Sequence, residues 1–284
     1  MSYLFFALAS PVLMALGNIT QKVVVSDDKV HGGVFAGAYG ILVALLTLPF
    51  ALISDKLMVQ MFSPSVILVL LLMSVLYAFA MWGFFTAMKH VPISEITLLE
   101  STTPLWVLFG SVLFLGESLT WNKFIGVLFL IAGLFVTFRY KGVKRWSGYH
   151  TLGLVSGALY AGAYMTDKYL LDYLPTLSYQ VLSFGLPSIL ILGYFYKRAK
   201  ELKYFFVDKR ARNIVLSSAF VGGGYYTLFK AYQLSGEISL VNPIYETKSL
   251  WVVLMGIVFL KEKDFLRRKI IGMILAIIGV LLVS

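Results

Sequence analysis

The residues best suited to chemistry lie within one long apolar segment, in residues 238–251, which read ISLVNPIYETKSLW. At about 100° per helical residue, the polar side chains of this stretch fall on one helix face; they are Ser239, Asn242, Glu246 and Ser249. A carboxylate at membrane depth costs about 2.5–3.5 kcal/mol even on the cheaper insertion scales. The position of Glu246 therefore predicts a function, either binding the amine of a solute or carrying a proton.

Pro243 and Lys248 bear on this prediction. Because proline removes a backbone donor, we expect the helix to be loosened at Pro243. The alternative for Glu246 is a structural ion pair with a lysine, either Lys248 or one on another helix. Side chains two residues apart do not face each other on a helix, so we expect Lys248 to be a poor partner.

The stretch has a twin in residues 93–106, which read ISEITLLESTTPLW. Both copies begin with Ile-Ser and end with Leu-Trp, and a Phe-Leu-x-Glu sequence follows each. The polar face of the twin includes Thr97 and Ser101, with Glu100 at its edge, and these are candidate solute ligands. Glu95 lies near the start of the span, where capping or snorkelling would also explain it.

A second motif is repeated, NITQK at 18–22 and YMTDK at 164–168. Four of its side chains are further candidates for the site: Asn18, Lys22, Tyr164 and Lys168. A pair of lysines could bind a solute carboxylate. The alternatives are snorkelling to the interface, or neutralisation of Lys168 by its neighbour Asp167.

Aromatic side chains make up 15% of the chain. Most such residues in membrane proteins face lipid or the interfacial belts. A few could line a cavity for an amphipathic amino acid or a cation. The candidates for such a cavity are Tyr77, Trp82, Tyr164, Tyr225 and Tyr245.

Composition places these residues in a membrane. The chain is 59% hydrophobic and 13% charged, with a mean hydropathy of +0.85, whereas a soluble domain carries about 25% charged residues. The absence of cysteine excludes disulfides and thiolate metal sites. The formal charge of +10 comes from short loops between apolar spans, which is typical of the positive-inside rule rather than of nucleic-acid binding. We therefore expect no nucleic-acid partner, no metal and no cofactor.

The predicted fold is an all-α membrane protein with ten transmembrane helices. Each apolar segment is near the ~20 residues that span the hydrocarbon core. The predicted spans are 3–25, 32–53, 65–88, 93–115, 122–138, 150–171, 176–196, 213–233, 238–260 and 267–283. Residues 1–138 and 150–284 form two five-helix repeats, joined by the basic loop 139–149. Because five is odd, the second repeat must enter the membrane from the opposite side, which gives an inverted-topology repeat.

Charge predicts the orientation of these spans. Lysines and arginines concentrate in loops 139–149, 197–212 and 261–269, which we expect to be cytoplasmic. Both termini would then lie outside, in a multi-pass protein of the cell (inner) membrane.

The tails of the two halves carry a family resemblance. They read FLGESLTWNKFIGVLFLIAGLFV at 114–136 and FLKEKDFLRRKIIGMILAIIGVLLV at 259–283. This repeated pattern resembles the EamA-type ten-helix members of the drug/metabolite transporter superfamily. The resemblance implies a secondary transporter built of two inverted five-helix bundles around a central cavity. It implies no substrate, since the superfamily carries amino acids, drugs, sugars, nucleotide-sugars and cations. Many relatives have basic residues after the second span, whereas loop 54–63 here has only Lys56.

The function predicted is secondary active transport of a small polar metabolite by alternating access. An amino acid or related zwitterion is favoured as solute, with protons as a candidate coupling ion through Glu246. The alternatives are a multidrug or quaternary-ammonium cation transporter and a non-transporting membrane accessory subunit. We expect no enzyme, because the chain has no HExxH or GxSxG signature. The expected partners are the solute, the bilayer and protons, in a monomer or homodimer.

Overall fold

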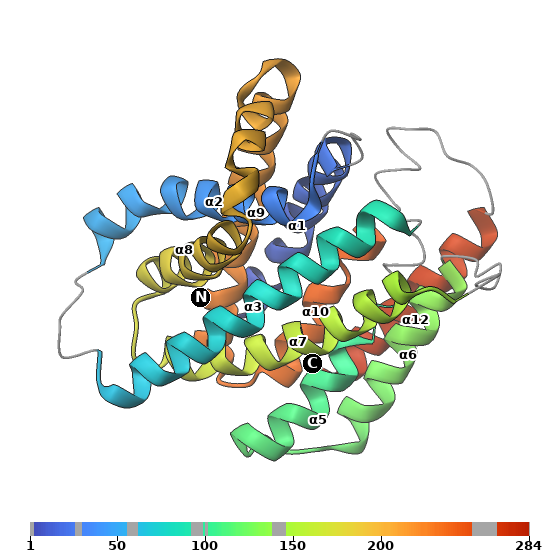
Figure 1. The fold of residues 1–284 in the computed structure, drawn as a ribbon. Coiled ribbons are helices and arrows are strands. Elements are labelled where there is room, and N and C mark those ends of the chain that lie inside the picture. The colour runs from blue at the N-terminus through green and yellow to red at the C-terminus, as the bar shows by residue number, and fades with distance from the viewer. Residues whose placement is uncertain are drawn as a thin grey trace.

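The computed structural model describes residues 3–25, 30–55, 62–91, 99, 102–137, 146–251 and 266–283, and within these ranges the chain is helical with no strand (Figure 1). The helices in chain order are α1 (Tyr3–Val25), α2 (Gly32–Ser54), α3 (Pro64–His90), α5 (Thr103–Leu115), α6 (Trp121–Thr137), α7 (Gly148–Leu171), α8 (Thr176–Tyr194), the 3-10 helix η2 (Tyr196–Phe206), α9 (Asp208–Ser235), α10 (Ile238–Glu246) and α12 (Leu266–Val283). The prediction of an all-α membrane fold is confirmed.

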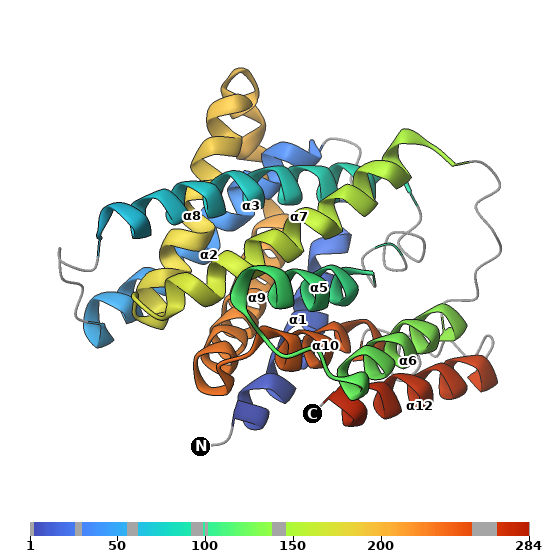
Figure 2. The ribbon, with the colours of Figure 1, turned by 90° about the horizontal axis from the view of Figure 1, so that it is seen from below.

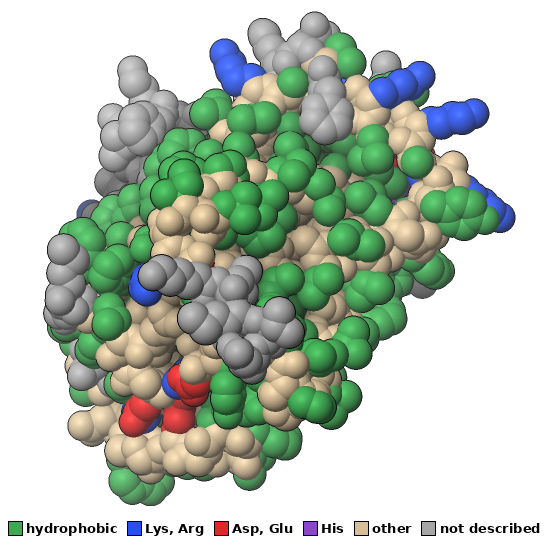
Figure 3. All heavy atoms as spheres, turned by 90° about the vertical axis from the view of Figure 1, so that its left-hand side faces the viewer, with side chains coloured by type: hydrophobic (Ala, Val, Ile, Leu, Met, Phe, Trp, Pro, Cys, Tyr) green, Lys and Arg blue, Asp and Glu red, His purple; other side chains and the backbone are tan. Residues whose placement is uncertain are grey.

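The surface of the helix bundle is that of a protein in a bilayer. Within the described ranges, four helices are long and apolar enough to cross a membrane: Tyr3–Gln21, Gly32–Ser54, Pro64–His90 and Thr176–Tyr194. Large apolar side chains point outward along them, including Ile53 at 85% and Leu68 at 68% exposed. Hydrophobic side chains cover much of the face in Figure 3, and Lys and Arg gather toward its upper end. An apolar surface of this extent is stable in lipid rather than in water.

The two halves are related by the way their helices pair. α1 packs along α9 and α3 packs along α7, while α2 lies against α8, α5 against α10 and α6 against α12. Figure 2 shows the last pair side by side. Exchanging the halves turns the α1–α9 pair into α7–α3 and maps the α2–α8 and α6–α12 pairs onto themselves. This pattern of pairing is that of an inverted repeat.

The contact between α6 and α12 shows the same relation at single residues. A Cβ atom added at Gly133 would lie 2.5 Å from the Gly272 carbonyl oxygen, and one added at Gly279 would lie 2.5 Å from the Gly126 carbonyl oxygen. Gly126 and Gly272 are equivalent positions of the two halves, as are Gly133 and Gly279. The helices approach so closely because both crossing points lack a side chain.

The predicted span 238–260 departs from a continuous helix. α10 ends at Glu246, a turn follows at Thr247, and residues 248–251 are helical again. The backbone N–H of Thr247 donates to the Ile244 carbonyl three residues back, at 3.1 Å. Pro243, which supplies no N–H, already weakens this helix. The expectation of a loosened helix holds, but the interruption falls one turn after the proline.

One other predicted segment differs from the structure, and another lies partly outside the described residues. In the predicted loop 197–212, η2 replaces an irregular connection and α9 begins at Asp208. Of the predicted span 93–115, the structure describes residue 99 and, from Thr102 on, the helix α5. The proposed boundaries between the two repeats, at 138 and 150, stay predictions.

Candidate solute-binding cavity

The candidate site is a cavity between the two halves of the helix bundle. It holds about 600 Å³ of empty space, which includes the open solvent at its mouth. Helices α1, α2 and α3 of the first half and α7, α8, α9 and α10 of the second half contribute to its wall. The lining residues are Met14, Asn18, Gln21, Tyr39, Tyr77, Met81, Phe84, Phe85, Tyr160, Tyr164, Ser183, Phe184, Tyr225, Tyr245 and Lys248. Because both halves form the wall, a movement of one half against the other would change the cavity.

Tyrosine rings form most of the polar wall. The ring of Tyr77 meets Tyr160 and Tyr164 edge-on, with centroids 6.1 and 6.3 Å apart. The ring of Tyr245 lies 6.2 Å from those of Tyr164 and Tyr225. Edge-to-face contacts of this kind hold the rings in place. The wall thus presents fixed aromatic faces and phenol hydroxyls.

One ion pair lies at the cavity wall. Nζ of Lys248 lies 3.2 Å from Oε1 of Glu246, and the two side chains are 4% and 2% exposed. The same ammonium lies 4.2 Å from the ring centroid of Tyr245, within cation–π range. Lys248 lines the cavity, while Glu246 lies behind it.

This ion pair corrects the expectation that Lys248 is a poor partner for Glu246. The expectation assumed a helix that continues through both residues. Because α10 ends at Glu246 and the chain turns at Thr247, side chains two residues apart come together. The charged part of the site thus lies where the helix is interrupted.

A second buried carboxylate, that of Asp167, lies nearby on α7. Asp167 is 0% exposed and accepts a hydrogen bond of 2.5 Å from the Tyr77 hydroxyl and another from the Tyr179 hydroxyl. The idea that Asp167 neutralises Lys168 is wrong, because Lys168 pairs with Asp172 at 2.8 Å. Adjacent residues point about 100° apart on a helix, so Asp167 turns inward while Lys168 turns toward the helix end.

The predicted site residues divide into four groups. Five of them line the cavity: Asn18, Tyr77, Tyr164, Tyr225 and Tyr245. Three are buried beside it without lining it: Asn242, Glu246 and Ser249. Two lie elsewhere, since Trp82 packs on the exposed ring of Phe79 and Lys168 pairs with Asp172. Thr97, Glu100, Ser101 and the side chain of Lys22 lie outside the described residues.

Several lining residues were not among the predicted ligands. Gln21 occupies in the NITQK motif the position that Asp167 occupies in YMTDK, so the repeat itself was a signal for it. Tyr160 precedes Tyr164 by one helical turn, which was a second signal. Tyr39 and Ser183 lie in helices that are apolar on most sides, where periodicity does not distinguish a cavity face.

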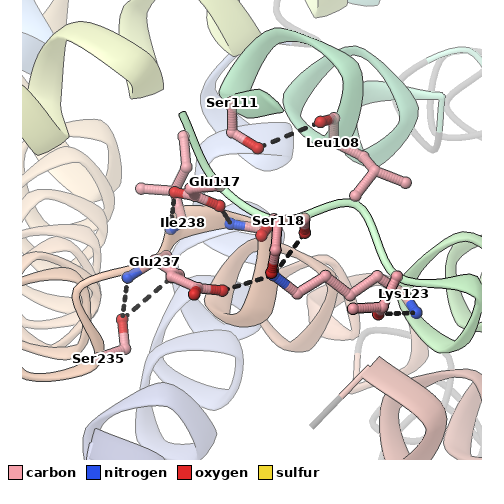
Figure 4. Close-up of polar contacts among 10 residues, drawn as sticks. Leu108, Ser111, Glu117, Ser118, Lys123, Ser235, Glu237 and Ile238 are labelled. Atoms are coloured by element: carbon pink, nitrogen blue, oxygen red, sulfur yellow. Dashed lines mark hydrogen bonds and ion pairs between the residues drawn. The ribbon is translucent and has the colours of Figure 1, made fainter. Parts of the chain in front are cut away.

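The two halves are also joined at one end of the bundle by the clasp, which we define as Glu117, Lys123, Glu237, Ile238 and Ser239 (Figure 4). The Glu117 carboxylate accepts hydrogen bonds from the first backbone N–H groups of α10, at 2.8 and 3.1 Å. The Glu237 carboxylate pairs with Lys123 at 2.5 Å. A carboxylate at a helix N-terminus is stabilised by the free N–H groups and the helix dipole. Each half thus provides one carboxylate that binds the other half.

Fold and cavity together define a polytopic membrane protein of the inverted-repeat type, with a cavity between its halves. The model of the EamA-like transporter family matches residues 1–139 and 148–284, and the chain belongs to this family.

Two further proteins are similar to this chain. An uncharacterised transporter of Archaeoglobus fulgidus is 23% identical over 205 residues, which cover 70% of this chain and 69% of that protein. A protein of known crystal structure matches with a TM-score of 0.76 at 15% identity, over 100% of this chain and 97% of the other. The second likeness supports the fold alone.

The buried pair predicts a strong asymmetry between single and double substitutions. Removing one partner leaves an uncompensated charge, which costs about 3–5 kcal/mol, whereas replacing both with neutral side chains restores much of that loss. Glu246→Gln and Lys248→Met should each lower the thermal unfolding midpoint in detergent, and the double variant should recover much of the loss. Comparing the wild type, the two single variants and the double variant measures the coupling free energy between Glu246 and Lys248.

The matched control for this cycle is Lys168→Met, which breaks the exposed pair with Asp172. Exposed pairs contribute about 0–1 kcal/mol, so this variant should unfold close to the wild type. Additive effects of the two changes at the buried pair would show that Glu246 and Lys248 do not depend on each other.

Proposed function

We propose that the protein is a secondary active transporter of a small zwitterion, an amino acid or a close relative. The observation that carries this proposal is the wall of the cavity, where a buried ion pair and tyrosine faces come together. Membership of a transporter family supports transport itself. The ion pair and the tyrosine rings of the cavity wall support a zwitterion as the solute.

The net charge of the wall favours a zwitterion. Among the described residues that line the cavity, Lys248 is the charged one, and the Glu246 carboxylate pairs with it. A solute with a net charge would leave that charge uncompensated in a low dielectric. A zwitterion brings both charges. Its carboxylate would approach the Lys248 ammonium and its amine the faces of the tyrosine rings.

Alternating access follows from the position of the cavity. Both halves supply its wall, and the clasp joins both halves at one end. Rocking of the halves about this site would expose the solute to one side of the membrane at a time. In this proposal Glu246 holds Lys248 in place, which differs from the predicted roles of amine ligand and proton carrier.

The aromatic wall also bears on the second candidate, a transporter of quaternary ammonium cations. Tyrosine faces attract such cations. Lys248, whose ammonium lies at the same wall, repels them. The charge of the wall therefore favours a zwitterion as solute. A competition assay between amino acids and quaternary ammonium cations distinguishes the two candidates.

We expect neutral amino acids to raise the thermal unfolding midpoint of the purified protein. A ligand at a hundred times its Kd stabilises the folded state by about 2.7 kcal/mol, which is a shift of several degrees. Lys248→Met should lose the shift, because the ligand carboxylate loses its partner. Lys230→Met is the matched control, since Lys230 hydrogen-bonds Gln233 outside the cavity, and it should keep the shift. A shift with lipophilic cations alone, or an equal shift in Lys248→Met, would contradict the proposal.

We also propose that the end of the bundle that carries η2 faces the cytoplasm of a cell-membrane protein. Its exposed Lys197, Arg198 and Lys200 fit the positive-inside rule. The chain has no cysteine, so single cysteines report the topology directly. Ala199→Cys should react with a membrane-impermeant maleimide only after intact cells are permeabilised. Ser118→Cys, in the exposed connection between α5 and α6, should react without permeabilisation. The reverse pattern would invert the orientation.

A further inference from the structure

Asp167 is a buried ionisable group to which the proposed solute site assigns no role. It is fully buried in α7, and none of the described Lys, Arg or His side chains forms an ion pair with it. Two phenol hydroxyls donate to its carboxylate, one from Tyr77 on α3 and one from Tyr179 on α8. A carboxyl group held in this way within a membrane protein is a functional site by default.

We propose that Asp167 is the proton-binding site of this transporter, and that Tyr77 links the proton to the solute. This inference rests on the proposed function. It places proton coupling at Asp167 rather than at Glu246, whose carboxylate is engaged with Lys248.

The geometry around Tyr77 supplies the link. Its ring lines the cavity, and its hydroxyl donates to Asp167 at 2.5 Å. Tyr77 therefore touches both the space for the solute and the group that takes the proton. A solute that displaces the Tyr77 ring would disturb the hydrogen bond to Asp167, and protonation of Asp167 would in turn free the ring.

The same hydrogen bond joins the two halves of the repeat. Tyr77 lies on α3 of the first half, and Asp167 lies on α7 of the second. A hydrogen bond to an ionised carboxylate is about twice as strong as one between neutral groups. When a proton binds to a carboxylate oxygen of Asp167, a new O–H bond forms and the charge-assisted bond across the halves is lost. Release of that proton on the other side restores it. Protonation of Asp167 thus weakens one contact between the two halves and changes the relative stability of their arrangements.

The other titratable groups that face Asp167 do not change charge near neutral pH. Tyr77 faces it from α3 and Tyr179 from α8, and Tyr232 interacts with it electrostatically from α9. Phenols lose their protons only near pH 10 or above. On its own helix, Lys168 is held by Asp172.

The first test reads the proton on Asp167 without any solute. Infrared difference spectra of the protein in lipid, taken between mildly alkaline and mildly acidic buffer, should show the carbonyl band of a protonated carboxylic acid. The band should be lost in Asp167→Asn and kept in Asp172→Asn, which makes the same change five residues along the chain at an exposed pair. Tyr77→Phe should displace the midpoint of the titration, since one donor to the carboxylate is removed. A titrating band that persists in Asp167→Asn, or no band in the wild type, would overturn the proposal.

The second test reads coupling in proteoliposomes that contain a pH-sensitive dye. Adding a mixture of neutral amino acids should move protons in the wild type and in Asp172→Asn. Asp167→Asn should lose the proton movement while still exchanging labelled for unlabelled amino acid, because exchange needs no net proton. Proton movement that persists in Asp167→Asn would overturn the proposal, as would solute transport without protons in the wild type. If the wild type moves no solute, the proposed function fails, and the infrared titration alone decides whether Asp167 binds a proton.

Discussion

The structure depends on one electrostatic constraint, the burial of two opposite charges two residues apart in the chain. Neither Glu246 nor Lys248 is stable alone at this depth, and a continuous helix would turn them away from each other. The helix stops at Glu246 and the chain turns at Thr247, and the ammonium lies 3.2 Å from the carboxylate. The same turn places Lys248 at the cavity wall, against the Tyr245 ring. A structural requirement of the pair thus fixes the charged element of the proposed solute site.

The pair acts within a molecule whose two halves are held together by a few polar contacts and by close helix packing. At one end, in the clasp, Glu117 of the first half accepts hydrogen bonds from the start of α10, and Glu237 of the second half pairs with Lys123. Near the cavity, the hydrogen bond from Tyr77 to Asp167 crosses between them. At α6 and α12, glycines allow the backbones to approach closely. The clasp and the bond from Tyr77 to Asp167 both involve carboxylates, so a change of charge can alter them. The glycine contacts do not depend on charge.

Much of the fold could be predicted from the sequence because apolar spans and repeated motifs are linear signals. The repeats at 18–22 and 164–168 gave both the two halves and, through Asn18 and Tyr164, part of the cavity. The ion pair of Glu246 with Lys248 was the less favoured alternative from the sequence, because helical periodicity was extended through the turn at Thr247. Trp82 was misplaced for another reason: α3 is apolar on every side, so its pattern does not separate lipid from cavity. The sequence suggested Lys168 as the partner of Asp167 because the two are adjacent in the chain. Its partners in the structure, Tyr77 and Tyr179, come from other helices.

The most direct test of the central claim, a zwitterion bound between Lys248 and the tyrosine faces, is a counterflow assay in proteoliposomes. Vesicles preloaded with unlabelled neutral amino acids are diluted into trace amounts of the same labelled compounds. The account predicts transient accumulation of label, which excess quaternary ammonium ion leaves unchanged. Accumulation of a labelled quaternary ammonium ion, with none of any neutral amino acid, would contradict it.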